Sequence, residues 1–292
     1  MVVLEFIPTK LSIDYETTDH PFGYSFTFVC MNMDLSHKSA LVCGSTQGIG
    51  KAAALELAQM GAKVILLARN EEKLRAVKAE LSTAKGQQHD YIPADFSKPE
   101  EVQDKINRYI IRNGAVHILV NNTGGPPAGP IILAKPEEFT AAFSNHLLCN
   151  HLLVQALADG MKRSGYGRII NIISTSVKQP LKGLGVSNTI RAAVANWSKT
   201  MSMELAPFGI TVNNVLPGAT QTARLQGIFE NKAAKTGLTL EEVKKEMLEE
   251  IPAGRFAEAS EVANAIAFLA SPAAAYITGI NISVDGGRTG CL

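Results

Sequence analysis

The chain has 292 residues, of which 46% are hydrophobic, and its 28 Lys and Arg residues against 27 Asp and Glu give a formal net charge of +1. This balance provides no electrostatic basis for binding nucleic acid or an anionic membrane, and no apolar run approaches the roughly 20 residues that span a bilayer. The four cysteines show neither a C-x-x-C pair nor metal-ligand spacing. These totals favour a cytoplasmic protein with one sizeable core, reduced thiols and no bound metal.

The first 35 residues lie outside the pattern that organises the rest of the chain. They lack the basic and then apolar segments of a secretory signal. Residues 26–31 could add an edge strand, and Met31 and Met33 are candidates for the native start because they precede the first core strand. We expect residues 1–35 to be an N-terminal extension and residues 36–292 to be a single domain.

From residue 38 onward, predicted strands and helices alternate. Strands are expected at residues 40–43, 64–68, 90–94, 116–120, 168–173, 210–216 and 280–284. Helices are expected from residue 51, over 70–84 with Asn70 as cap, from Ser97 as cap with Pro99 in the first turn, and over 136–161, 185–206 and 258–270. This alternation predicts an α/β fold: a single Rossmann-type doubly wound parallel sheet with helices on both faces and ligands at the carboxyl ends of the strands.

Residues 220–251 interrupt this alternation with a charged helical stretch. A solvent-exposed surface helix and a mobile lid explain it equally well, because the stretch follows a strand end that should line the site. We therefore treat residues 220–251 as a candidate helical lid.

The segment Ala-Leu-Val-Cys-Gly-Ser-Thr-Gln-Gly-Ile-Gly at residues 40–50 joins a buried strand to a helix. Its glycines are spaced G-x-x-x-G-x-G. Glycine allows the chain to turn tightly and lets the amides at a helix N-terminus approach a pyrophosphate. Many strand-to-helix turns carry glycines without a ligand, but this position favours a nucleotide.

Several motifs, taken together, resemble those of the short-chain dehydrogenase/reductase family over residues 36–288, most closely the 3-oxoacyl-acyl-carrier-protein reductases. The glycine segment matches T-G-x-x-x-G-x-G, Asn-Asn-Thr-Gly at 121–124 matches N-N-A-G, and residues 217–222 match P-G-x-x-x-T. Gly-Arg-Phe-Ala at 254–257 and Asn-Ile-Ser-Val-Asp-Gly-Gly at 281–287 match as well.

The resemblance implies a set of cofactor-binding positions running from the pyrophosphate to the adenine and the nicotinamide. They are Gly44, Ser45, Thr46, Gln47, Gly48, Ile49, Gly50, Asp95, Phe96, Asn121, Gly124, Arg191, Pro217, Gly218 and Thr222. Arg69 ends the second strand, where an NAD-binding enzyme would carry an acidic residue for the ribose hydroxyl. A guanidinium there suits a 2′-phosphate, so NADP is favoured over NAD, although Arg69 could also be a solvated helix-start residue.

The catalytic positions depart from the family pattern. Ser174 fills the family's serine position, but Ser187 and Arg191 stand where the resemblance implies the Tyr and Lys of Y-x-x-x-K. By the same resemblance His146 falls at the position of the active-site Asn, although a one-residue shift would place Asn145 there instead. A serine hydroxyl is a far weaker acid than a tyrosine held near a lysine. His146, or a water held by Ser174 and Ser187, would then donate the proton, although His146 could equally be a polar residue facing a neighbouring helix.

Three functions remain open from the sequence. The first is an NADP(H)-dependent oxidoreductase that reduces a small-molecule carbonyl, or oxidises an alcohol, with a non-standard proton donor. The second is a nucleotide-binding sensor or assembly subunit without ketoreductase activity, and the third is an enzyme of dehydration or isomerisation. The resemblance also implies a homotetramer or homodimer formed through the helices at 136–161 and 185–206.

Overall fold

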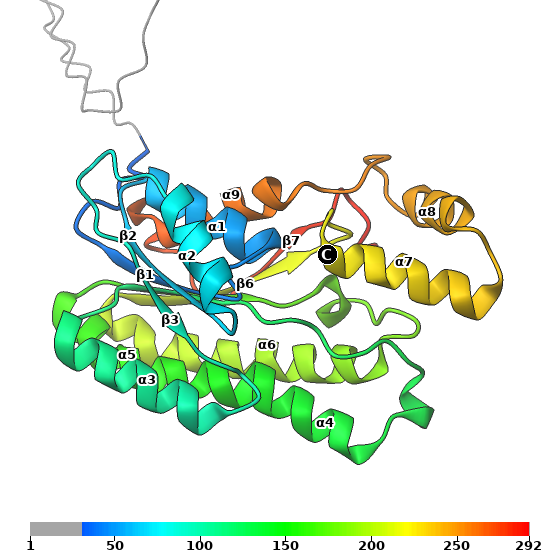
Figure 1. Cartoon of the computed structure of the whole chain (residues 1–292), viewed down its shortest axis with the longest axis horizontal. Coiled ribbons are helices and arrows are strands. Elements are labelled where there is room, and N and C mark those ends of the chain that lie inside the picture. The colour runs from blue at the N-terminus through cyan, green and yellow to red at the C-terminus, as the bar shows by residue number, and fades with distance from the viewer. Residues whose placement is uncertain (1–30, 292) are drawn as a thin grey trace, which may run out of the picture.

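The computed structural model describes residues 31–291, so the possible edge strand at 26–31 lies outside this range except for Met31. Seven strands form one parallel sheet in the order β3-β2-β1-β4-β5-β6-β7 (Figure 1). Their bounds are β1 (Ser39–Cys43), β2 (Lys63–Ala68), β3 (Asp90–Pro93), β4 (Ile118–Asn121), β5 (Gly167–Ile172), β6 (Ile210–Pro217) and β7 (Asn281–Val284). The expected doubly wound parallel sheet is confirmed.

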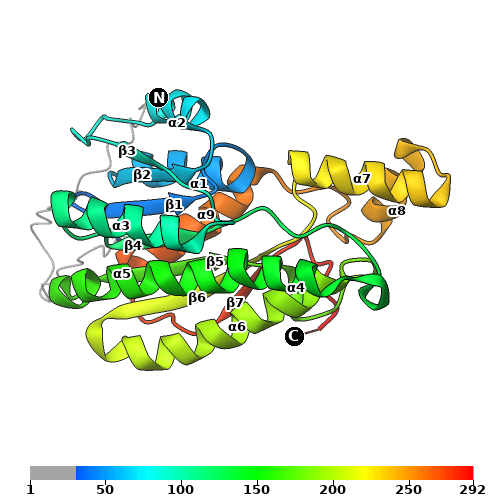
Figure 2. The ribbon, with the colours of Figure 1, turned by 60° about the horizontal axis from the view of Figure 1, so that its bottom comes forward.

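Helices cover both faces of the sheet (Figure 2). One face is covered by α1 (Gly48–Gln59), α2 (Glu71–Glu80) and α9 (Ala259–Ala270), and the other by α3 (Pro99–Asn113), α4 (Pro136–Phe143), α5 (Cys149–Ser164) and α6 (Gly185–Leu205). Within residues 31–291, no helix combines the length and the apolar character needed to cross a bilayer.

The central strands are apolar on both faces because helices cover both. In β1, Ala40 and Val42 pack in the core beneath α1 and α9, whereas Leu41 and Cys43 pack in the core beneath α3 and α5. A strand buried on both sides reads as a continuous apolar run, which is the signal that predicted it. Leu35, ahead of β1, is also fully buried in the first of these cores.

Two local predictions need correction at helix ends. Asn70 caps α2 as expected, since its side chain accepts a hydrogen bond from the Lys73 amide at 2.8 Å, but the helix ends at Glu80 rather than residue 84. The expected Ser97 cap of α3 is wrong. The Ser97 amide instead donates to Asp95 Oδ1 at 3.0 Å in the preceding turn, and α3 begins at Pro99 after Lys98.

The long helix expected over 136–161 is interrupted by a π-helical turn. Helix α4 continues through this turn (Ser144–Leu148) into α5. The extra residue of a π turn shifts the helix face that follows and is frequent at functional sites. Here the turn contains both Asn145 and His146.

Residues 220–251 form two helices, α7 (Ala223–Thr236) and α8 (Leu240–Glu249), that extend past the carboxyl ends of the strands (Figures 1 and 2). They share a small apolar cluster separate from the main core, made by Ala219, Leu225, Phe229, Val243, Met247 and Ile251. The expected helical insertion is therefore present as a helix pair with its own packing.

A row of four asparagines crosses the sheet from β4 to β7. Asn121, Asn171, Asn214 and Asn281 are register partners on neighbouring strands. Each side-chain amide donates to the next asparagine's side-chain oxygen, at 2.8, 3.0 and 2.8 Å in order. A buried polar group is stabilising only when it is paired, so this row fixes the relative register of four strands.

We expect Asn171→Ala to lower the free energy of unfolding by about 2–5 kcal/mol, because it leaves the Asn121 amide and the Asn214 carbonyl oxygen without their partner. Asn113→Ala, at the exposed end of α3, is the matched control and should change it by less than about 0.5 kcal/mol. Urea unfolding followed by circular dichroism measures both, and equal losses would contradict a stabilising role for the row.

Candidate active site

A large cleft runs along the carboxyl ends of the strands, where β1 and β4 are neighbours and the chain connections turn to opposite sides of the sheet. Its volume is about 1400 Å³. This switch point is where open α/β sheets bind ligands. Most of the predicted site residues line it: Gly44, Thr46, Gln47, Gly48, Ile49, Arg69, Asp95, Phe96, Gly124, Ser174, Ser187, Arg191, Pro217, Gly218 and Thr222.

The glycine turn is packed too tightly for any side chain at two of its positions. A Cβ on Gly50 would lie 2.2 Å from the Gly44 carbonyl oxygen, and one on Gly44 would lie 2.6 Å from the Asn122 carbonyl oxygen. Gly44 and Gly48 also have positive φ angles of 58° and 54°, which favour glycine. The turn thus leaves the start of α1 bare toward the cleft, as a pyrophosphate requires.

Four predicted residues do not line the cleft. Ser45 is buried with its hydroxyl 3.5 Å from the Leu67 carbonyl oxygen. Gly50 contacts the turn itself, and Asn121 belongs to the asparagine row. His146 is 2% exposed and is hydrogen-bonded to Thr123.

Ser174, Ser187 and Arg191 come from two elements that meet at the cleft. Ser174 follows β5, and its hydroxyl accepts a hydrogen bond from the Ser176 amide at 3.1 Å. Ser187 and Arg191 lie one turn apart in α6, and each is 8% exposed. The Arg191 guanidinium donates to the Ile172 carbonyl oxygen at 2.7 Å, and burial, with Arg224 nearby, lowers its pKa to about 10. It remains a cation at neutral pH.

His146 is linked to the cleft through Thr123. Its Nδ1 is hydrogen-bonded to the Thr123 hydroxyl, and Thr123 lines the cleft. Burial, together with the positive charges of Arg191 and Arg224, lowers the pKa of His146 to about 2. The imidazole is therefore neutral under physiological conditions and does not carry the proton of an imidazolium acid.

Asn145 lines the cleft whereas His146 does not, which fits the one-residue shift that the sequence left open. Thr123, Gly125 and Arg224 also line the cleft and were not among the predicted site residues. Thr123 was treated only as part of a motif, although it stands where N-N-A-G has alanine. Arg224 lies two residues beyond P-G-x-x-x-T, in the first turn of α7. A basic residue is unfavourable at a helix N-terminus, and that signal was available in the sequence.

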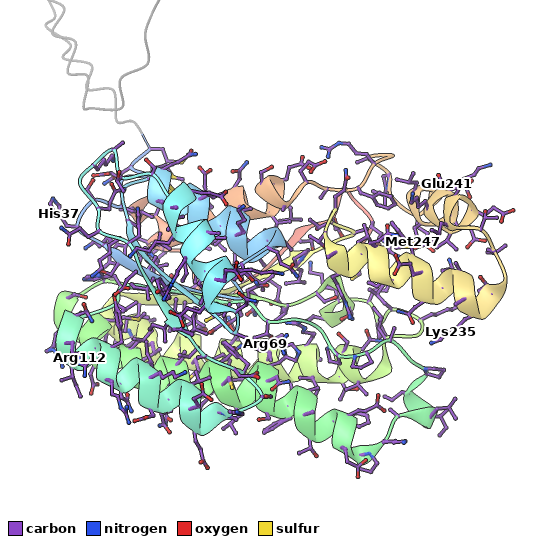
Figure 3. All side chains as sticks on the ribbon, viewed as in Figure 1. His37, Arg69, Arg112, Lys235, Glu241 and Met247 are labelled. Atoms are coloured by element: carbon purple, nitrogen blue, oxygen red, sulfur yellow. The ribbon has the colours of Figure 1, made fainter. Side chains whose placement is uncertain are left out.

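Arg69 and Asp95 line the cleft beside β2 and β3 (Figure 3 labels Arg69). The hydrogen bond from the Ser97 amide lowers the pKa of Asp95, and the charge of Arg69 contributes to the same shift. Arg69 makes no ion pair with a carboxylate of the described residues. Its cationic head is thus available to a ligand at this end of the cleft.

The fold and the cleft together define a doubly wound α/β protein of the dinucleotide-binding class. A family model described as "Enoyl-(Acyl carrier protein) reductase" matches residues 44–289. The chain belongs to the short-chain dehydrogenase/reductase family.

Characterised relatives match over nearly their whole length. The NADPH-dependent reductase BacG of Bacillus subtilis is 32% identical over 254 residues, which are 87% of this chain and 98% of BacG. The 3-oxoacyl-[acyl-carrier-protein] reductase FabG of Staphylococcus epidermidis is 36% identical, covering 86% of this chain and 98% of FabG. The crystal structure of L-sorbose reductase from Gluconobacter frateurii with NADPH and L-sorbose superposes with a TM-score of 0.83 at 30% identity, covering 90% and 100% of the two chains.

The depressed pKa of His146 predicts an effect of pH on stability. Because the unfolded chain binds this proton more readily than the folded protein, the folded state loses stability as the pH falls below about 6.5. We expect the drop in unfolding free energy between pH 7.5 and 5.5 to be smaller by about 1 kcal/mol in His146→Gln. His37→Gln, at an exposed position, should retain the wild-type drop. Urea unfolding at both pH values measures this, and an unchanged drop in His146→Gln would mean that His146 protonates freely in the fold.

Proposed function

We propose that this protein is an NADP(H)-dependent oxidoreductase that reduces the carbonyl group of a small molecule. The observation that carries the proposal is one continuous cleft that joins the glycine turn to Ser174, Ser187 and Arg191. The relatives named as NADPH-dependent and 3-oxoacyl reductases support it. They also argue against the alternative of a sensor or assembly subunit without catalysis.

The cleft fits a dinucleotide at three places. The bare glycine turn and the start of α1 would hold the pyrophosphate. Asp95, Phe96 and Gly124 would border the adenosine, while Pro217, Gly218 and Thr222 would position the nicotinamide. Among the remaining predicted residues, Ser45, Gly50 and Asn121 would act by holding the turn and β4 in place, since their side-chain positions are buried.

Arg69 supports NADP over NAD. Arg69 directly follows β2 and lies with Asn70 and Lys73 on the wall of the cleft. Lys73 adds a second positive charge there. Arginine binds phosphate through paired, charge-assisted hydrogen bonds. A 2′-phosphate on the adenosine ribose would satisfy both cations.

The bound nicotinamide supplies hydride to the carbonyl carbon. We propose that the hydroxyls of Ser174 and Ser187 hold the carbonyl oxygen and a water molecule, and that this water delivers the proton. Arg191, fixed by its hydrogen bond to Ile172, would stabilise the negative charge that develops on the oxygen. His146 is neutral and would keep the Thr123 hydroxyl oriented toward the cleft instead of donating a proton itself.

We also propose that residues 36–292 act as one domain in which α7 and α8 close over the substrate. Leu225, Ile228 and Met247 of these helices line the cleft, and the pair packs mainly on itself. Closure of such an element would exclude bulk water from the site while leaving the one water held by Ser174 and Ser187. The homo-oligomer and the cytoplasmic location remain predictions from the sequence.

The first test is NADPH oxidation by the purified protein with 3-oxoacyl thioesters, simple ketones and quinones. We expect turnover by the natural sequence, and a fall of at least tenfold in kcat for Ser187→Ala, because the proton-carrying water loses a partner. His146→Ala should retain more than a third of kcat if its role is to orient Thr123. Activity that appears only in Ser187→Tyr with Arg191→Lys would contradict the proposal and show a hydride site without a proton donor.

Replacing Arg69 tests the choice of cofactor. We expect Arg69→Gln to raise the Kd for NADPH by about 10- to 100-fold, which corresponds to the loss of a charge-assisted contact. NADH lacks the 2′-phosphate, so its Kd in the same variant should change by less than about threefold. Titration by nucleotide fluorescence measures both values. Parallel weakening of the two cofactors would indicate a general change in the cleft instead.

A further inference from the structure

The cleft is strongly basic although the whole chain is nearly neutral. Eight basic side chains line it against two carboxylates, those of Asp95 and Glu250: Arg69, Lys73, Lys182, Arg191, Arg224, Lys232, Lys235 and Arg288. Glu250 is already paired with Arg288, and Lys232 with Glu246 outside the lining. A cleft with one dominant sign of charge concentrates ligands of the opposite sign.

The guanidinium of Arg224 is held in place by a hydrogen bond to the backbone. It projects from the first turn of α7 and donates through Nη2 to the Pro126 carbonyl oxygen at 2.7 Å. Its guanidinium lies against Gly125, where an added Cβ would come within 3.1 Å of Nη2 and 3.3 Å of the central carbon. An added Cβ would therefore crowd the guanidinium, which would have to give by a few tenths of an ångström. Among the described residues the Pro126 carbonyl oxygen is its only hydrogen-bond partner, which leaves the other guanidinium donors for a ligand.

Arg224 and Arg191 bring positive charge to the same cleft. Both side chains line it, and the charge of Arg224 adds to the effect of burial in lowering the pKa of Arg191 and of His146. Neither arginine has a carboxylate partner within the described part of the chain. Arg191 is buried, whereas Arg224 is exposed at the wall of the cleft, so an anion in this part of the cleft would meet one buried and one solvent-accessible cation.

Arg191 is among the predicted cofactor positions, but the proposed cofactor does not account for Arg224. Its 2′-phosphate is assigned to Arg69 and Lys73, and its pyrophosphate to the glycine turn. Arg224, in α7, packs against Gly125 and Pro126 in the segment that follows β4. Its charge contributes to the lowered pKa of Arg191 in α6. The position beside Ser187 and Arg191 is where the carbonyl substrate would lie.

We propose that the substrate is a small oxo acid and that Arg224 binds its carboxylate. The planar guanidinium offers two parallel N–H donors to a carboxylate, and Arg191 adds positive charge next to the carbonyl. This assignment rests on the proposed reductase function and narrows its substrate class. It makes Arg224 a specificity-determining residue.

The test compares oxo acids with their methyl esters, which keep the same carbonyl and lose the charge. Pairs derived from 3-oxobutanoate, 4-oxopentanoate and 2-oxobutanoate vary the distance between the two groups. We expect kcat/KM to favour one acid over its ester by at least tenfold. Arg224→Met should lower kcat/KM for that acid at least tenfold while changing the ester less than threefold, and Arg224→Lys should restore part of the loss.

Further variants separate this role from other effects. Gly125→Ala, which displaces the guanidinium, should also reduce the preference for the acid, whereas Arg112→Met removes the same charge from the far end of α3 and should have no effect (Figure 3). The NADPH Kd should stay within threefold in Arg224→Met. A large rise in that Kd would assign Arg224 to the cofactor pyrophosphate, and a preference for phosphate-bearing ketones would assign it to a phosphate; either result overturns the proposal.

A binding measurement keeps the outcome independent of turnover. Malonate and succinate cannot be reduced, and we expect one of them to change the fluorescence of NADPH bound to the natural protein but at least tenfold more weakly in Arg224→Met. Such binding without any carbonyl turnover would retain the carboxylate site and refute the reductase. Turnover of esters as fast as acids, with no dicarboxylate binding, would refute the carboxylate site and retain the reductase.

Discussion

The close backbone contact between the glycine turn and β4 determines the geometry of the whole site. Gly44 packs on the Asn122 carbonyl, Gly50 packs on Gly44, and the Asn122 side-chain amide donates to the carbonyl oxygens of Cys43 and Gly44 at 3.2 and 3.3 Å. No side chain fits at either glycine. This contact joins the carboxyl ends of β1 and β4. It brings the start of α1 to the point where the chain connections turn to opposite sides of the sheet.

The register of the strands extends this positioning across the sheet, from β4 to β7. The asparagine row begins at Asn121, one residue before Asn122, and passes through β5 and β6 to β7. Asn171 in β5 lies three residues before Ser174, and Asn214 in β6 lies three residues before Pro217, so the loops that carry the proposed catalytic and nicotinamide positions leave strands in a defined register. Ser174, the proposed catalytic serine, and the glycine turn are thus placed by one polar and one steric constraint.

The sequence predicted the sheet and its direction, because buried parallel strands appear as local apolar runs. Most of the site residues predicted from the motif spacings do line the cleft. The sequence could not predict the pairing of Thr123 with His146 or of Arg224 with Gly125, since both join segments far apart in the chain. The π turn could not be predicted either, because one extra residue does not visibly change the apolar pattern of a 26-residue helix. Serine is a residue type that often caps helices, but the Ser97 amide donates a hydrogen bond to Asp95 Oδ1 in the turn before α3.

The departures from the family pattern fit one another, which argues against simple loss of function. Histidine at 146 would leave a buried ring nitrogen without a partner if residue 123 were alanine, and threonine supplies that partner. Arginine at 191 keeps the positive charge of the lysine it replaces and cannot lose it at neutral pH. A decaying site has no reason to keep Arg191 as a buried cation without a carboxylate partner among the described residues, because that charge lowers stability in the empty protein. That cost is understandable if an anionic ligand balances the charge when the site is in use.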